Sequence, residues 1–251
     1  GNVVLKASVT RNYRYPTLND LYFQPGGNPD LKPEHGFTYD GGASFDVKCA
    51  GGRLRVSGEV SAFDSYIDDW ILWRPTFKGF WTPLNIRRVH SYGFEAKASL
   101  TADLGGGWSI SANGLFSMTR SLNRADPVSE NDLSRGRQLP YIPVYTSSAT
   151  GRVSWRGWSL AYKWRYYSER YTVSSGDMTV TGVVAPYFMN DVSLEKRFVW
   201  RWGELSVRAD VNNLFGEEYE TVLSHPMPGR NFGIFIGISP DFGAKSRRNR
   251  N

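Results

Sequence analysis

The chain has 251 residues, of which 40% are hydrophobic and 15% aromatic, and it carries a formal net charge of +6 at pH 7. Because no apolar run approaches the ~18 residues of a transmembrane helix, the composition excludes a helical membrane protein. Four of the positive charges lie at the end of the chain, at Lys245, Arg247, Arg248 and Arg250. Nucleic-acid binding therefore has no support beyond this short tail, and no nucleic acid is expected as a partner.

Apolar and polar residues alternate along most of the chain. The pattern occupies residues 3–9, 37–49, 54–62, 94–100, 108–116, 145–153, 158–166, 192–194, 205–211 and 232–238. A period of two is that of a β-strand with one apolar and one polar face. The sequence therefore predicts an all-β, antiparallel protein of about ten strands.

The connections between these segments alternate strictly between short and long. Short turns with glycine lie near Gly51, Gly105, Gly157 and Gly203. Long connections lie at about 11–35, 68–87, 119–143, 171–186 and 214–230. This rhythm is typical of outer-membrane barrels, which have short periplasmic turns and longer extracellular loops. It predicts that both ends of the ten-stranded array lie on the periplasmic side.

A soluble β-sandwich would also alternate, and charges in mid-strand, such as Glu59 and Lys97, fit either a solvated face or a hydrated lumen. Three features favour the membrane. The strand runs reach the ~9–11 residues that cross a bilayer, whereas soluble strands average ~5–6. The connections alternate in length, and the tryptophans gather at the short turns, where indole suits the membrane interface. We therefore expect a multi-pass transmembrane β-barrel in contact with outer-membrane lipid.

Candidate ligand-binding residues lie in the expected extracellular connections. The richest connection contains Trp70, Trp73, Phe77, Trp81, Arg87 and Arg88, and the first adds Tyr13 and Arg14. Clustered aromatic rings and guanidinium groups suit a large, flat or anionic ligand. The alternative is that they form an interfacial girdle and the strand ends above the membrane. The four prolines and the Gly26-Gly27 pair of the first connection predict a fixed ledge rather than a mobile lid.

Several motifs occur in order along the chain. They are Tyr15-Pro16, Leu21-Tyr22, GNPDLKPE at residues 27–34, Asn85, YGFE at 92–95, LPYIP at 139–143, NNLF at 212–215, Tyr219-Glu220 and PMPGR at 226–230. In this order they strongly resemble the C-terminal barrel half of TonB-dependent outer-membrane receptors. The segments around Leu21-Tyr22 and Tyr219-Glu220 look most like the cobalamin-receptor branch of that family.

The resemblance implies a barrel of 22 strands around an N-terminal plug, of which residues 1–242 form the last ten strands. The plug domain and the TonB box are absent from this chain, and residues 243–251 are expected to be a disordered basic tail. The family takes up metal chelates, such as cobalamin or ferric siderophores, with energy passed on by TonB. The implied partners are a metal chelate, the TonB complex through the missing plug, and a surface lipoprotein.

Two other classes of function are open to a barrel. A passive porin or adhesin would have an unplugged lumen, so a plug-coding segment upstream of the chain would exclude it. An outer-membrane enzyme needs acid, base or nucleophile groups that converge at the lumen rim. The three histidines, His35, His90 and His225, are scattered, and no G-x-S-x-G motif is present. We therefore expect no enzyme activity, no metal site and no cofactor.

Overall fold

The computed structural model describes residues 2–75, 79–126, 130, 133–172 and 182–240. In this part of the chain, ten strands form one antiparallel sheet, and each strand pairs with the next long strand in sequence. They are β1 (Asn2–Arg14), β2 (Glu34–Cys49), β3 (Leu54–Pro75), β4 (Trp81–Gly105), β5 (Trp108–Asn123), β6 (Tyr145–Trp155), β7 (Trp158–Tyr167), β10 (Tyr187–Trp200), β11 (Gly203–Asn212) and β14 (Asn231–Pro240). The predicted ten-stranded antiparallel array is confirmed.

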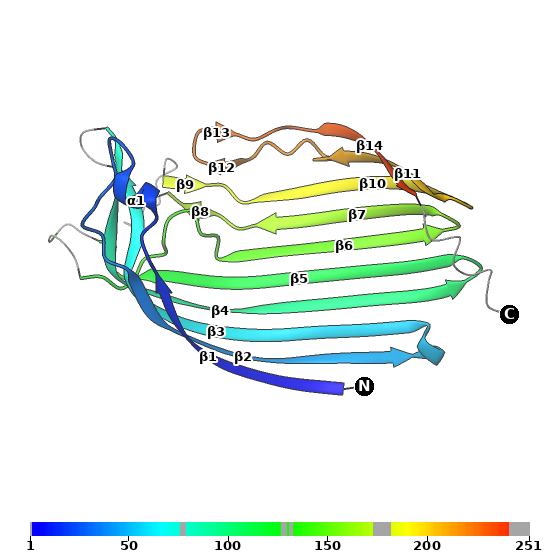
Figure 1. Cartoon of the computed structure of the whole chain (residues 1–251), viewed down its shortest axis with the longest axis horizontal. Coiled ribbons are helices and arrows are strands. Elements are labelled where there is room, and N and C mark those ends of the chain that lie inside the picture. The colour runs from blue at the N-terminus through cyan, green and yellow to red at the C-terminus, as the bar shows by residue number, and fades with distance from the viewer. Residues whose placement is uncertain (1, 76–78, 127–129, 131–132, 173–181, 241–251) are drawn as a thin grey trace.

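Smaller elements gather at one end of this sheet, where the long connections lie (Figure 1). A short helix, α1 (Leu18–Tyr22), follows β1. Two small two-stranded sheets pair β8 (Arg170–Tyr171) with β9 (Val183–Val184) and β12 (Glu220–Val222) with β13 (His225–Pro226). Among the described residues, no helix has both the length and the apolar character needed to cross a membrane.

The four predicted short turns lie together at the opposite end of the sheet (Figure 1). They occupy residues 50–53, 106–107, 156–157 and 201–202. The third depends on Gly157, which has φ +84, and a Cβ there would lie 2.7 Å from the carbonyl oxygen of Arg197. Glycine adopts this left-handed conformation without a steric penalty. The turn therefore packs tightly against β10.

The register keeps the apolar residues on one face across the sheet. One row of paired residues crosses nine strands, from β2 to β14. It consists of Val47, Val56, Leu100, Ala112, Gly151, Tyr162, Val192, Val211 and Phe232. We call this the outward face. Because paired residues point to the same side of a sheet, the predicted alternation is confirmed.

Polar side chains connect the strands on the opposite face. The hydroxyl oxygens of Thr38 and Ser65 lie 2.8 Å apart, and the Ser91 hydroxyl donates to that of Ser121 over 2.9 Å. The guanidinium of Arg165 lies 2.6 Å from the carboxylate of Asp191. The sheet is a single layer, and its edges are β1 and β14. Val89 and Leu139 are among the most deeply buried apolar residues, at 0% and 2% exposed. Both lie toward the end of the sheet that carries the long connections.

One predicted connection has a different structure. Residues 68–87 are not a loop, because β3 continues to Pro75 and β4 begins at Trp81. The pairing of the two strands continues without a change of register from Asp68 opposite Arg88 to Pro75 opposite Trp81. The hairpin therefore extends well beyond Glu34, the first residue of the neighbouring strand β2. This extension is the support on which the first connection rests.

Candidate functional site

The first connection begins with a capped helix. The backbone N–H of Asp20 donates to the Thr17 hydroxyl over 3.1 Å, and the Thr17 N–H donates to the Asp20 carboxylate over 2.9 Å. This reciprocal arrangement is a capping box, which satisfies N–H groups that the first helical turn leaves free. The two bonds give α1 a defined start, although it has only five residues.

Asp20 also joins this helix to the β3–β4 hairpin. The indole N–H of Trp73 donates to its second carboxylate oxygen over 2.9 Å, and the Trp73 ring meets Phe23 edge to face with centroids 5.8 Å apart. Burial raises the pKa of the Asp20 carboxyl, but the hydrogen bonds from Thr17 and Trp73 outweigh burial and hold that pKa below its ordinary value. The ionised form of Asp20 is therefore the one that this contact stabilises.

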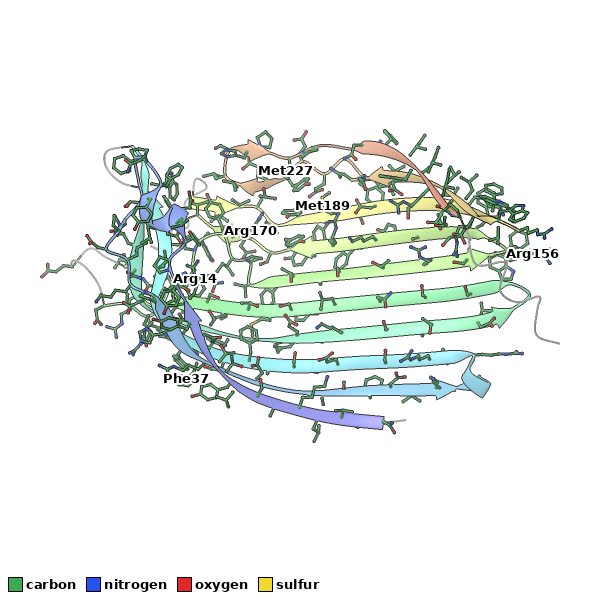
Figure 2. All side chains as sticks on the ribbon, viewed as in Figure 1. Arg14, Phe37, Arg156, Arg170, Met189 and Met227 are labelled. Atoms are coloured by element: carbon green, nitrogen blue, oxygen red, sulfur yellow. The ribbon has the colours of Figure 1, made fainter. Side chains whose placement is uncertain are left out.

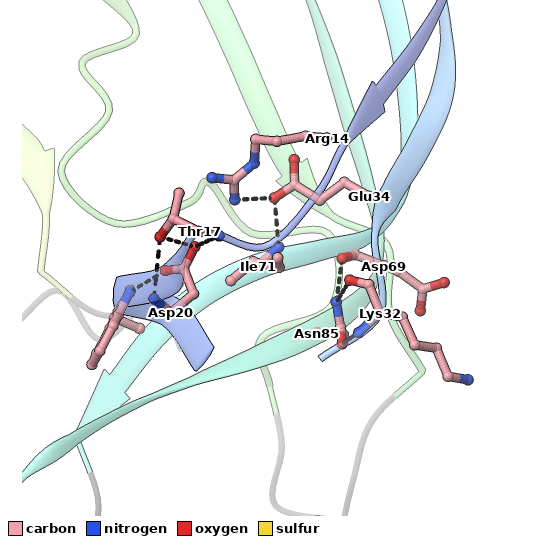
Figure 3. A network of polar contacts seen from close by, with 9 residues as sticks. Arg14, Thr17, Asp20, Lys32, Glu34, Asp69, Ile71 and Asn85 are labelled. Atoms are coloured by element: carbon pink, nitrogen blue, oxygen red, sulfur yellow. Dashed lines mark hydrogen bonds and ion pairs between the residues drawn. The ribbon is translucent and has the colours of Figure 1, made fainter. Parts of the chain in front are cut away.

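Glu34 forms a second junction, at the start of β2 (Figure 3). One carboxylate oxygen accepts the backbone N–H of Ile71 over 2.8 Å and lies 2.5 Å from the guanidinium of Arg14. Glu34 is 6% exposed. The pairing of β2 with β3 ends at His35, opposite Asp68, so no β2 carbonyl is paired with Ile71. The Glu34 carboxylate accepts the N–H of Ile71 instead.

Asn85 forms the third junction, and each polar atom of its amide group has a partner. The amide donates to the carbonyls of Lys32 and Asp69 over 3.0 and 2.6 Å and accepts the N–H of Lys32 over 2.9 Å. Nearby, Asn28 donates to the Pro83 carbonyl over 3.1 Å. The expected ledge is thus present, and side-chain hydrogen bonds hold it in addition to its prolines.

The backbones also approach closely at one point of the ledge. A Cβ on Gly26 would lie 1.9 Å from the carbonyl oxygen of Trp81. Any larger residue at position 26 therefore has to move the connection away from the hairpin. We use the name ledge for residues 15–33 together with these contacts.

The structure divides the predicted ligand-binding residues into groups. None of those described lies in a loop: Tyr13 and Arg14 end β1, Trp70 and Trp73 lie in β3, and Trp81, Arg87 and Arg88 lie in β4. This corrects the expectation of loop positions, and the reason is the continued pairing of the hairpin. Phe77 lies outside the described residues.

Two of these residues hold the ledge, because the Trp73 indole contacts Asp20 and the Arg14 guanidinium contacts Glu34. Tyr13 and Trp81 are each 55% exposed. Side chains alternate between the two faces along β3, so Trp70 lies on the face opposite to Ile71 and Trp73. Arg88 forms an ion pair with Asp68 over 3.0 Å. The structure therefore does not bring all the predicted residues together at one point.

A cleft that the sequence did not predict lies at the same end of the sheet. It has a volume of about 770 Å³ and is lined by residues of three segments, among them Val184, Tyr187, Glu217, Tyr219 and Met227. The rings of Tyr187 and Tyr219 lie 4.7 Å apart. The sequence signals were Tyr219-Glu220 and PMPGR, which contributed to the resemblance but were not considered as site residues.

Arg170 fixes one wall of this cleft. It is 5% exposed, and its guanidinium donates to the carbonyls of Glu220 and Thr221 over 2.8 and 3.2 Å. The guanidinium carbon lies 5.2 Å from the centre of the Tyr187 ring, a cation–π contact. Arg170 therefore joins β8, β10 and β12 around the cleft.

An apolar outward face, a polar opposite face, short turns at one end and elaborate connections at the other define a section of a transmembrane β-barrel wall. The family model for the TonB-dependent receptor-like β-barrel matches residues 1–214. The chain belongs to this family, which confirms the predicted relationship. Members of the family are outer-membrane transporters and receptors rather than enzymes.

Among curated proteins, the chain is similar to two proteins named vitamin B12 transporter BtuB. It is 26% identical over 239 residues to that of Photobacterium profundum, which covers 91% of this chain and 34% of the relative. It is 27% identical over 227 residues to that of Vibrio vulnificus, covering 87% and 31%. The chain thus spans about a third of the length of these relatives.

Solved structures show the same fold. The copper transporter OprC superposes with a TM-score of 0.68 at 22% identity, covering 94% of this chain and 37% of that one. The ferric yersiniabactin uptake receptor FyuA from Yersinia pestis superposes with a TM-score of 0.64 at 19% identity, covering 96% and 35%. At these identities the likeness concerns the fold alone.

Proposed function

We propose that the chain is part of the barrel wall of an outer-membrane receptor that actively takes up a metal chelate, such as cobalamin or a ferric siderophore, with energy supplied through TonB. The observation that carries the proposal is the similarity to B12 transporters over 91% of the chain. The end with the long connections supports it, since the ledge there is flanked by exposed aromatic rings. The remaining two thirds of such a receptor would supply the contact with TonB.

The ledge and its rim have different roles in this proposal. Trp73 and Arg14 position the ledge, because their polar groups already contact Asp20 and Glu34. Trp81, which is 55% exposed and lies on the same face of the hairpin as Trp73, offers its ring to a large ligand. Tyr13 pairs with His35 and lies on the outward face. Trp70, Phe77, Arg87 and Arg88 remain candidate ligand contacts.

The test is binding of cyanocobalamin and of ferric siderophores to the intact purified protein, measured by calorimetry. Trp81→Ala should weaken binding of the preferred chelate by roughly tenfold, the effect of losing an aromatic contact that the ligand buries. Trp202→Ala, at a short turn on the opposite end, is the matched control and should leave binding unchanged. Absence of binding to any chelate would overturn the proposal.

Energy coupling is tested separately, by uptake of the same chelate in cells that carry or lack TonB. The proposal expects saturable uptake that is lost without TonB. Uptake that persists without TonB and rises linearly with concentration would instead indicate a passive porin. This experiment distinguishes the two kinds of transport even if the chelate is bound weakly.

A further inference from the structure

One row of the outward face, at the end with the short turns, combines three indoles with a lysine. Cross-strand pairing places Trp108, Trp155, Trp158 and Lys196 side by side over β5, β6, β7 and β10. The next residues on this face of β10, two positions to either side, are Leu194 and Phe198. Apolar alternation thus predicts a hydrophobic residue at position 196, and the lysine is the exception.

Lys196 lies among aromatic rings and one carbonyl oxygen. Its ammonium nitrogen is 4.9 Å from the centre of the Trp158 ring and 5.6 Å from that of Phe198. It donates a hydrogen bond to the backbone carbonyl of Arg156 over 3.0 Å. The long side chain therefore extends from the lipid-facing row toward the turn, as lysines do when they reach for the interface.

Arg156 brings a second cation to the same place. Figure 2 shows it at the short-turn end, far from Arg14 and Arg170. Its backbone N–H donates to the Gly107 carbonyl of the neighbouring turn over 3.3 Å, and its guanidinium carbon lies 5.4 Å from the centre of the Trp155 ring. Both cations thus flank the pair of indoles that faces outward.

The nearby carboxylates lie on the other face. Glu195 alternates with Lys196 in β10 and pairs with Arg197 over 3.4 Å. Glu204 pairs with Val199, and Val199 lies on the face opposite to Phe198 and Trp200. Glu204 therefore also lies on the face opposite to the outward one. On the outward side, the two cations at this turn therefore face no carboxylate among the described residues of these strands.

The Lys196 ammonium and the Arg156 guanidinium have donors left to bind an anion. An ammonium group has three donors, and the described contacts of Lys196 use one of them for a protein oxygen. A cation in a lipid-facing row is costly unless it meets a charged or polar partner at the interface. Indole rings mark the depth of the headgroups, where the phosphate of a phospholipid is the anion available to both cations.

We propose that Lys196 and Arg156, flanked by Trp155 and Trp158, form a binding site for the phosphate of an anionic phospholipid in the leaflet at the short-turn end. We expect phosphatidylglycerol to bind there, because its net negative charge complements two cations that have no carboxylate beside them. The inference rests on the proposed membrane placement and is independent of which chelate is transported.

The test is native mass spectrometry of the intact protein in detergent with phosphatidylglycerol, with phosphatidylcholine, or with inorganic phosphate alone. We expect retention of phosphatidylglycerol over phosphatidylcholine and no effect of inorganic phosphate. Lys196→Met should reduce the affinity for phosphatidylglycerol about fivefold, the contribution of one basic residue at an anionic surface. Lys163→Met, in β7 on the opposite face, is the matched control and should bind as the unaltered protein does.

A conservative variant separates charge from packing. Lys196→Arg keeps the positive charge and should retain the lipid, and circular dichroism melting confirms that each variant is folded. Equal retention by Lys196→Met and the unaltered protein would overturn the proposal. So would loss of the lipid in Lys196→Arg, equal retention of the two phospholipids, or displacement by inorganic phosphate at matched ionic strength. Chelate binding by the same preparations reports separately on the proposed function.

Discussion

Trp73 donates its indole N–H to the carboxylate of Asp20 over 2.9 Å and thereby joins the helix of the first connection to β3. The two residues are 53 positions apart in the chain. The bond assigns Trp73 a structural role at a place where the sequence indicated a ligand contact. It also makes the position of the ledge depend on the ionisation state of one buried carboxyl group.

Replacing Trp73 by phenylalanine tests this bond while an aromatic ring remains to contact Phe23. A hydrogen bond to a charged group contributes about 1.5–3 kcal/mol, so Trp73→Phe should loosen the ledge measurably. Limited proteolysis of the intact protein should cut residues 15–33 faster by roughly tenfold. Trp81→Phe is the control, because that indole is 55% exposed. Equal cleavage of the two variants would assign the ledge to its other contacts.

Acid should release the ledge through Asp20. Hydrogen bonds from Thr17 and Trp73 depress the pKa of this carboxyl below its ordinary value of 3.8. A depressed pKa in the folded protein means that the stabilisation is fully present above the ordinary value and is lost as the pH falls through the folded pKa. Pepsin, which is active in acid, should therefore begin to cut residues 15–33 only at a pH below the ordinary pKa of an aspartate carboxyl.

The variant Asp20→Asn isolates this effect, because its side chain does not titrate. Its ledge should already be loosened at neutral pH, and the step in cleavage below the ordinary carboxyl pKa should be absent. Asp40→Asn is the matched control, since Asp40 is exposed and lies in β2, where it accepts a hydrogen bond from Ser8. If the acid step persists in Asp20→Asn, a different carboxyl group controls the ledge.

The amide of Asn85 should control hydrogen exchange in the ledge. Its side-chain oxygen accepts the backbone N–H of Lys32 over 2.9 Å. Asn85→Ala removes this acceptor and leaves two carbonyl groups without their donor, at a cost of about 1–3 kcal/mol. A peptide that contains Lys32 should therefore exchange roughly tenfold faster in the variant. Asn113→Ala, on β5, is the control, and equal exchange in both variants would contradict the assignment.

The strands and their faces were predictable because they follow from local alternation, as Phe45, Val47 and Cys49 show with their period of two. The hairpin extension was missed for an equally local reason. Asp68, Asp69 and Pro83 are residues that disfavour strands, yet β3 and β4 continue past them, and the extended hairpin and the first connection stabilise each other. The hydrogen bond from the N–H of Ile71 to the carboxylate of Glu34 is one of the contacts between them.

The candidate site was predictable only in part, because its contacts join residues that are distant in sequence. Aromatic enrichment drew attention to Trp73 and Trp81, but no pattern shows that the first indole contacts Asp20 and the second stays exposed. The cleft beside Tyr187 was missed because β9, β10 and the last connection each contribute a few residues to it. None of these segments is unusual alone.

Arg170 should hold that cleft together by the shape of its guanidinium as well as by its charge. It donates to two successive carbonyls, of Glu220 and Thr221, while it stacks on Tyr187. Lysine keeps the charge but lacks a planar fork that can reach both oxygens from one position. Arg170→Lys should therefore expose residues 213–230 to proteolysis, and Arg170→Ala should do so more strongly.

The matched control for this change is Arg135→Ala. Arg135 forms an ion pair with Asp126 over 3.4 Å, and both side chains are largely exposed. Such surface pairs contribute about 0–1 kcal/mol, so proteolysis of this variant should resemble that of the unaltered protein. If Arg170→Lys also behaves like the unaltered protein, charge alone secures the segment. The bidentate geometry at Glu220 and Thr221 would then contribute nothing to the cleft.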